Sequence, residues 1–279
     1  MLCGLEDDAS LVANGFLEGN SINELLEIYL MDLIGPHAYD KCGAEFPLLI
    51  KKLTVNGFLS VQVHPDDQIA EKRHNAYGKT EIWYVMDAGD DALLYLGFNR
   101  DLTERELQLR CLNDTLPEVM NCIHPKKGEC YFIPAGMAHA CGGGLTIAEV
   151  QQVSDITYRI YDWGREHNPQ TERPMHLNLA LDCIDLDACN PTPTTDGTLA
   201  NCPYFTAVYK EITAPVECDG METDGFLIYL CLEGSVEVVC ENKTAVLQRG
   251  DCLLVPDAVK QWTLLPKGKA VLMEVTQPD

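Results

Sequence analysis

The sequence has few basic residues, and this shortage limits the partners that the protein can bind. It contains 20 lysines and arginines against 43 aspartates and glutamates, which gives a formal net charge of −23 at pH 7. Such a charge repels polyanions, so nucleic acid and anionic membrane surfaces are excluded as expected partners. An anionic ligand would need cations concentrated at one place, and Lys79 and Arg159 are therefore of special interest.

Segments that direct a chain into a membrane are also lacking. No apolar run approaches the length needed to span a bilayer, and the first eight residues lack the basic region of a signal peptide. We therefore expect a cytoplasmic protein. The 279 residues, 46% of them hydrophobic and 23% charged, have the composition of an ordinary globular protein with a large core.

The chain has 13 cysteines but no C-x-x-C pair. The odd number argues against complete pairing, and Cys231, Cys240 and Cys252 stand among apolar neighbours, where a free thiol behaves as a small hydrophobe. We expect reduced thiols in the core and no disulfide scaffold.

One stretch, Gly128 to His139, organises the rest of the chain. A strand enters a turn containing Pro134 and Gly136, and the turn presents His139 just as the next apolar run begins. A single turn histidine is more often solvated or structural than a ligand. Its meaning therefore depends on what accompanies it.

A second cluster lies upstream of this stretch. Apolar and polar residues alternate over 59–64, so Gln62 and His64 point to the same face of one strand, and Glu81 opens another strand. Together with His139 they offer two imidazoles, a carboxylate and an amide oxygen, which predict a first-row metal site with an open position. The alternative is that the upstream three form the solvent face of an antiparallel sheet.

These residues resemble a known family. Residues 128–139 fit the second cupin motif, G-x5-P-x-G-x2-H, and the runs 62–67, 78–84 and 158–162 are similar to type I mannose-6-phosphate isomerase (phosphomannose isomerase), most closely its short bacterial form. The resemblance implies a mainly β fold of two cupin-type (jelly-roll) β-barrels with a few short helices. It also implies one Zn²⁺ per chain, held by Gln62, His64, Glu81 and His139.

The implied reaction interconverts mannose 6-phosphate and fructose 6-phosphate by proton transfer through an enediolate, so the expected partner is a small sugar phosphate. By the same resemblance Arg159 lines the active site, where it would stabilise the enediolate or bind the phosphate. Lys79 is the other cation near the metal strands, either as a phosphate contact or as a base. The sequence does not identify the general base.

Two alternatives stay open. Family members usually begin with some tens of residues more, including a Trp-Gly-Gly segment that this chain lacks, so a catalytically impaired metal- or sugar-phosphate-binding cupin is one of them. The other is a metal-dependent cupin enzyme of another class, such as a dioxygenase. That class usually has a His-x-His pair, and Gln62-Val-His64 therefore favours the isomerase.

We expect a metal-binding catalytic domain at residues 1–184, a linker at 185–201 and a cupin-like domain without metal ligands at 202–279. Gly128, Pro134 and His139 have counterparts 122 residues later, at Gly250, Pro256 and Gln261. No histidine follows His176.

Sheet edges could also support a homodimer.

Local signals predict the ends of several elements. Capping boxes open helices at Ser21 to Glu24 and at Thr103 to Glu106, and Pro65-Asp66-Asp67 stops a strand and caps a helix over 68–73. Apolar spacing predicts a helix over 174–184, and Asn56-Gly57 signals a hairpin turn.

Overall fold

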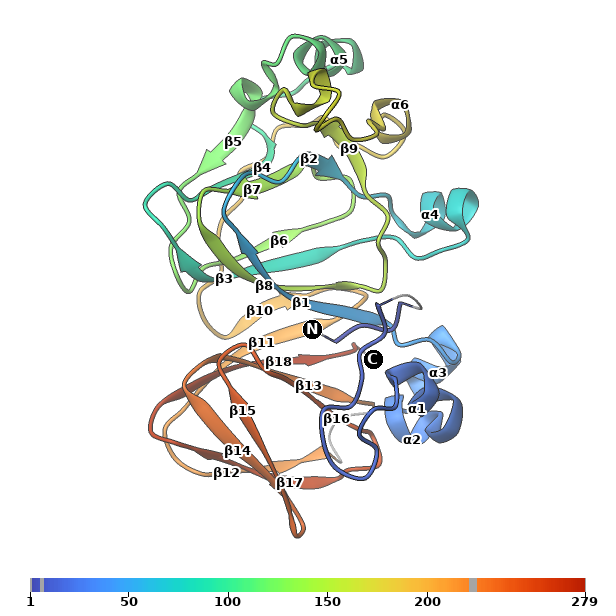
Figure 1. Cartoon of the computed structure of the whole chain (residues 1–279), viewed down its shortest axis with the longest axis vertical. Coiled ribbons are helices and arrows are strands. Elements are labelled where there is room, and N and C mark those ends of the chain that lie inside the picture. The colour runs from blue at the N-terminus through green and yellow to red at the C-terminus, as the bar shows by residue number, and fades with distance from the viewer. Residues whose placement is uncertain (1, 6–7, 221–224, 279) are drawn as a thin grey trace. The chain divides into compact units, whose positions relative to one another are not determined.

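The computed structural model describes residues 2–5, 8–220 and 225–278, and the chain forms two compact units (Figure 1). One unit comprises residues 52–193, and the other combines residues 1–51 with residues 194–279. Strands joined by short helices make up both units, which confirms the predicted mainly β fold. No helix among the described residues is long and apolar enough to cross a membrane.

The unit of residues 52–193 is built on two sheets that share an apolar core. Trp83, Tyr131, Leu94 and Cys141, which come from both sheets, belong to one buried cluster. The first sheet has the order β1 (Leu48–Val55), β8 (Leu145–Gln152), β3 (Glu81–Ala88), β6 (Cys130–Ile133), and the division between the units falls within β1. The second has the order β5 (Met120–Ile123), β4 (Leu93–Phe98), β7 (His139–Gly142), β2 (Val61–Val63), β9 (Tyr158–Tyr161).

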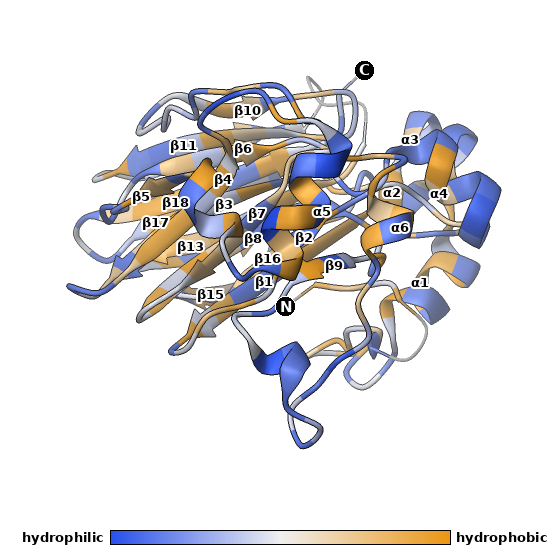
Figure 2. Ribbon diagram, turned by 90° about the horizontal axis from the view of Figure 1, so that it is seen from above, coloured by the Kyte–Doolittle hydropathy of each residue, from blue (hydrophilic) through white to orange (hydrophobic). Residues whose placement is uncertain are grey.

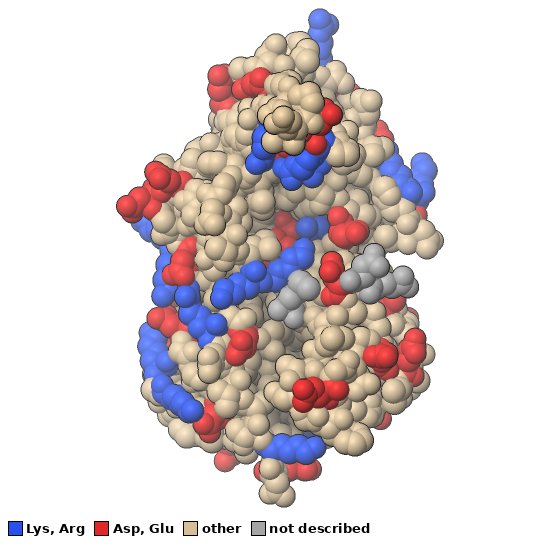
Figure 3. Space-filling model, viewed as in Figure 1, with Lys and Arg blue, Asp and Glu red and all other residues tan. Residues whose placement is uncertain are grey.

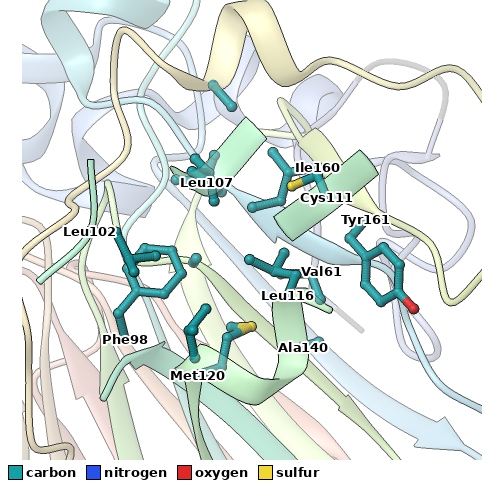
Figure 4. Packing of buried hydrophobic residues seen from close by; sticks show 14 of the residues in the cluster. Val61, Phe98, Leu102, Leu107, Cys111, Leu116, Met120, Ala140, Ile160 and Tyr161 are labelled. Carbon is teal, nitrogen blue, oxygen red and sulfur yellow. The ribbon is translucent and has the colours of Figure 1, made fainter. Parts of the chain in front are cut away.

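The second of these sheets is also buried on its outer face. Figure 4 shows side chains of this sheet packed against Leu107, Cys111 and Leu116, from α5 (Glu104–Leu112) and the 3-10 helix η2 (Leu116–Val119). Val61 and Ala140 belong to this outer cluster. Successive residues of a strand point to opposite faces, so the residues next to Val61 on β2 and next to Ala140 on β7 point into the interior of the unit.

The other unit repeats the two-sheet plan. Tyr229, Leu272, Val236 and Trp262 come from its two sheets and share one buried cluster. One sheet has the order β10 (Thr198–Asn201), β11 (Thr206–Ile212), β18 (Ala270–Thr276), β13 (Leu227–Glu233), β16 (Cys252–Val255). The other has the order β12 (Val216–Asp219), β17 (Gln261–Pro266), β14 (Ser235–Cys240), β15 (Lys243–Gln248). Among its described residues the α-helices are α1 (Ile22–Tyr29), α2 (Met31–Ile34) and α3 (Pro36–Cys42).

The predicted internal repeat is present in the backbone. Strands β6 and β16 begin 122 residues apart, at 130 and 252, and β7 and β17 are offset in the same way, at 139 and 261. Gly128 and Gly250, which precede β6 and β16, both have a φ of 93°. Gln261 therefore begins β17 as His139 begins β7.

The predicted helix starts are confirmed. Ser21 and Glu24 form a reciprocal capping box at α1, and the Thr103 side chain accepts the Glu106 amide at α5. Asp66 caps α4 (Asp67–His74). Figure 2 shows hydrophobic and hydrophilic segments alternating within the helices, as expected where one side is buried. All thirteen cysteines are free thiols.

Two local predictions were wrong. Strands β1 and β2, which flank Asn56-Gly57, belong to different sheets and form no hairpin. The helix predicted over 174–184 is reduced to α6 (Leu177–Ala180), because the His176 amide donates to the Arg159 carbonyl and keeps the preceding residues beside β9. Residues 198–201 of the predicted linker form β10.

Candidate metal centre

Three of the predicted site residues project from one row of the second sheet. Gln62 on β2 lies opposite His139 on β7 and opposite Arg159 on β9. Residues directly opposite each other project from the same face of a sheet. Val61 and Val63 pack in the outer cluster, so this row points into the interior of the unit.

His64, Glu81 and His139 meet in the interior. Oε1 of Glu81 lies 3.3 Å from Nε2 of His139 and 4.0 Å from Nε2 of His64. The three residues are 1%, 0% and 0% exposed. One ligand atom from each lies within 4.8 Å of the others, so all three can reach a single ion. The reading of His64 and Glu81 as a solvent-facing surface is thereby excluded.

Backbone carbonyls orient both imidazoles. Nδ1 of His64 lies 2.8 Å from the Ile156 carbonyl oxygen, and Nδ1 of His139 lies 2.8 Å from that of Met137. A carbonyl only accepts, so Nδ1 carries the proton in each ring and Nε2 keeps its lone pair. Each Nε2 is the nitrogen that faces Glu81, an arrangement characteristic of metal-ligating histidines.

Gln62 lies beside this cluster. Its side-chain nitrogen is 3.2 Å from Nε2 of His139. The nitrogen and oxygen of an amide are assigned from their hydrogen bonds, and a half-turn of the group would bring the oxygen to that place. The donor set would then be two imidazole nitrogens, a carboxylate and an amide oxygen, which fits zinc or another first-row divalent ion.

The charges in the interior favour a neutral His139 and a charged Lys79. Burial lowers the pKa of His139 to about 4, so the ring is neutral at pH 7, the form that binds metals. Nζ of Lys79 lies 3.2 Å from Oε2 of Glu81. Burial opposes the charge of Lys79, but Glu81 and Glu149 outweigh it and raise the pKa of the lysine.

A set of hydrogen bonds holds the segment that carries Lys79. The Gly78 amide donates to Oδ1 of Asp67, at 2.9 Å, and the side chain of Gln152 donates to the same oxygen, at 2.8 Å. Gln152 also accepts the amide of Thr80, at 2.9 Å. The backbone on both sides of Lys79 is therefore fixed by two side chains.

Arg159 is held at the edge of the interior. Its Nε donates to Oγ of Ser60 at 3.1 Å, and its Nη1 donates to the Pro174 carbonyl oxygen at 2.7 Å. Burial and the positive charge of Arg173 lower its pKa. Arg159 thus lies in the row of Gln62, as the resemblance implied, and its guanidinium is fixed in place.

Two further arginines accompany Arg159. Both Arg165 and Arg173 bind the carboxylate of Asp162, which is 0% exposed. Figure 3 shows a group of Lys and Arg side chains near β9, the strand that carries Arg159. Arg159, together with Arg165 and Arg173, which pair with Asp162, supplies the local positive charge that the acidic composition made necessary.

The interior positions of Trp83 and Glu149 were not predicted from the sequence. Trp83 lies opposite Glu149, and its Nε1 donates to Oε2 of that glutamate at 2.9 Å. Glu149 is 4% exposed. The signal that could have revealed it is the presence of Glu149 and Gln151 on one face of the largely buried strand β8.

The chain is similar to mannose-6-phosphate isomerases over most of its length. A model of the type I phosphomannose isomerase catalytic domain matches residues 8–87. A probable mannose-6-phosphate isomerase of Bacillus subtilis, GmuF, is 36% identical over 266 residues, which are 92% of this chain and 82% of that protein. The mannose-6-phosphate isomerase of Streptococcus mutans is 31% identical over 91% of this chain and 80% of its own length.

Solved structures agree with these relatives. The crystal structure of the Bacillus subtilis mannose 6-phosphate isomerase has a TM-score of 0.84 at 27% identity and covers 98% of this chain and 87% of that one. A Salmonella typhimurium phosphomannose isomerase variant, 15% identical with a TM-score of 0.80, has the same fold. These likenesses confirm the cupin-type architecture. By its sequence and its fold, the chain belongs to the mannose-6-phosphate isomerase family.

Proposed function

We propose that the protein interconverts mannose 6-phosphate and fructose 6-phosphate at the interior of residues 52–193. The observation that carries this proposal is the convergence of Nε2 of His64, Nε2 of His139 and a Glu81 oxygen in a buried space. Membership of the isomerase family gives that cluster its reaction.

Gln62, His64, Glu81 and His139 are the proposed ligands of one Zn²⁺ per chain. Bound zinc would act as a Lewis acid that stabilises negative charge on the sugar oxygens. The fixed Nδ1–H bonds of the two histidines keep both Nε2 atoms turned toward the ion site. The buried walls keep bulk water away from the developing charge.

The isomerisation moves a proton from C2 to C1 of the open-chain sugar, while a second proton moves from the C2 oxygen to the C1 oxygen. A side chain that is not a ligand must carry the carbon-bound proton. Glu149 is a buried carboxylate on the interior face, and we assign it this role. It would take the proton from C2, leaving an enediolate, and return it to C1.

The phosphate and the enediolate both need positive charge. We assign the phosphate to Arg159, supported by the positive charge of Arg165 and Arg173, which both pair with Asp162. Lys79 is held against Glu81 and adds positive charge beside the ion site, where we propose that it stabilises the enediolate.

The proposed domain roles follow from the same residues. All the proposed ligands lie within the predicted catalytic domain, 1–184, and no histidine is present in the segment 202–279. We propose that residues 185–201, the last four of which form β10, connect the two domains. A scaffolding role for the C-terminal domain and a homodimer both remain predictions.

A coupled assay tests the proposal. The protein is stripped with a chelator and assayed with mannose 6-phosphate before and after Zn²⁺ is added, and His139→Ala is assayed in the same way. His167→Ala is the matched control, because that side chain is 55% exposed. We expect zinc to restore turnover in the wild type and the control, and to leave the His139 variant without activity.

Other outcomes would favour the alternatives. Stoichiometric zinc without turnover would indicate an impaired metal- or sugar-phosphate-binding cupin. Turnover that does not depend on metal, or that survives in His139→Ala, would contradict the proposed centre.

A further inference from the structure

Trp83 separates the candidate metal centre from the apolar core of its unit. The side chain is 1% exposed, and it belongs to the buried cluster formed by both sheets. It stands two positions after Glu81 on β3, so both side chains point into the same interior. The indole is thus a boundary between polar and apolar groups.

Two groups of the site contact this indole. Nε1 donates to Oε2 of Glu149 at 2.9 Å. The ring also meets the imidazole of His139 edge-on, with centroids 5.3 Å apart and an interplanar angle of 82°. Indole nitrogen can only donate, so the direction of the bond to the carboxylate is unambiguous. Close packing leaves the indole one orientation, and that orientation fixes the carboxylate.

We infer that Trp83 is a positioning residue, which holds the Glu149 carboxylate in the orientation needed for proton transfer at the sugar carbons. The inference rests on the proposed function, and it gives Trp83 a role that packing alone would not. A purely structural tryptophan would support stability but would leave the chemical step unchanged once the protein is folded.

The chain provides a matched control for this inference. Trp262 is also a buried tryptophan, 6% exposed, and its Nε1 donates to the hydroxyl of Tyr229 at 3.3 Å in the C-terminal part of the chain. The variants Trp83→Phe and Trp262→Phe therefore remove the same donor from two buried sites. Both lose apolar area, so both are expected to have lower thermal stability.

The kinetic constants of the two variants should differ. We expect Trp83→Phe to lower kcat by about 10- to 100-fold with little change in KM, the usual scale for residues that orient a functional group. Trp262→Phe should leave kcat within about twofold of the wild type. Equal decreases of kcat in the two variants would overturn the inference. A higher KM with an unchanged kcat in Trp83→Phe would overturn it too.

A double-mutant cycle tests whether Trp83 acts through Glu149. If it does, Trp83→Phe should cost little further activity in a Glu149→Gln background, because the group it positions has lost its function. Additive losses would show that Trp83 acts elsewhere.

The indole resonance provides a test that does not depend on activity. In an ¹⁵N NMR spectrum the Trp83 indole signal, identified by its loss in Trp83→Phe, should move when Glu149→Gln removes the charged acceptor. Should the wild-type protein show no turnover, the proposed function fails, and this signal alone decides whether Trp83 holds Glu149. An unmoved signal would contradict the contact.

Discussion

At the scale of single residues, Asp162 organises the arginines next to Arg159. Its carboxylate is 0% exposed and binds both Arg165 and Arg173. Burial by itself would raise the pKa of Asp162, but the bonds from Arg173 and Arg165 outweigh it and lower the pKa below the ordinary value of an aspartate. The charged carboxylate is therefore part of the folded structure.

Removing this charge should make stability depend less on pH. We expect Asp162→Asn to lower the free energy of unfolding at pH 7 by about 2 kcal/mol, because hydrogen bonds to charged groups are worth about 1.5–3 kcal/mol each. The pKa is lower in the folded state than in the unfolded state. The wild-type advantage is therefore fully present above about pH 4 and is lost as the pH falls through the folded pKa.

Urea denaturation of both proteins between pH 7 and pH 3 measures this difference. Asp182→Asn is the control, because it removes an exposed partner of Arg73 and should cost at most about 1 kcal/mol. A gap between wild type and Asp162→Asn that stays constant down to pH 3 would contradict the prediction.

At the scale of elements, two adjacent carboxylates have different tasks at the start of α4. Asp66 accepts the Ile69 amide and caps the helix. Asp67 accepts the Gly78 amide and the Gln152 side chain, and so holds the segment of Lys79. A Cβ at Gly78 would lie 2.5 Å from the Asp67 nitrogen, which shows how closely the two segments pack.

Because Asp66 and Asp67 make different contacts, their substitution by alanine should affect stability and kcat differently. Asp66→Ala should lower stability by about 1 kcal/mol, as the loss of an N-cap does, and leave kcat nearly unchanged. Asp67→Ala should lower kcat by about 10-fold, because the backbone beside Lys79 loses its anchor. Thermal denaturation and the isomerase assay, applied to both variants, distinguish the two effects. Equal kcat values in the two variants would show that the anchor has no role in turnover.

The starts of helices and the shared face of neighbouring site residues were the features most easily predicted from the sequence. The caps at Ser21, Asp66 and Thr103 are local, since each joins residues three positions apart. Alternation over 59–64 placed Gln62 and His64 on one face of a strand, and the family resemblance favoured a metal site over a solvent-facing surface. Local chemistry and one recognised motif thus predict the centre of the site.

Pairing between distant strands explains what the sequence did not reveal. Asn56-Gly57 predicts a hairpin turn, but the strands on either side of it pair with other strands in two different sheets. The bond from the His176 amide to the Arg159 carbonyl shortens the predicted helix, and it joins segments 17 residues apart. Glu149 gained its importance only from its register opposite Trp83. The pattern within each segment does not specify which distant segment it pairs with.

At the scale of the whole molecule, the charge of −23 should make stability depend on salt. Like charges destabilise a compact chain through mutual repulsion, and about 0.1 M salt screens charges more than about 10 Å apart. We expect Tm to rise by about 3 °C between low salt and about 0.3 M NaCl, which corresponds to about 1 kcal/mol for a chain of this size.

Thermal denaturation at fixed metal content measures this effect. KCl in place of NaCl should give the same rise, because screening depends on ionic strength and not on the identity of the cation. A flat or falling Tm would mean that attractive ion pairs balance the repulsion.

The two glycines that share a φ of 93°, Gly128 and Gly250, have a consequence for finding such proteins among unannotated sequences. A side chain would be strained in this conformation in either half of the chain, so both halves have a glycine there. Only one half carries an imidazole at the end of the motif, at His139, where the other has Gln261. A search for the glycine and proline of the motif would therefore find both halves of this chain. A search that also requires the histidine at its end would find only the half with the candidate metal centre.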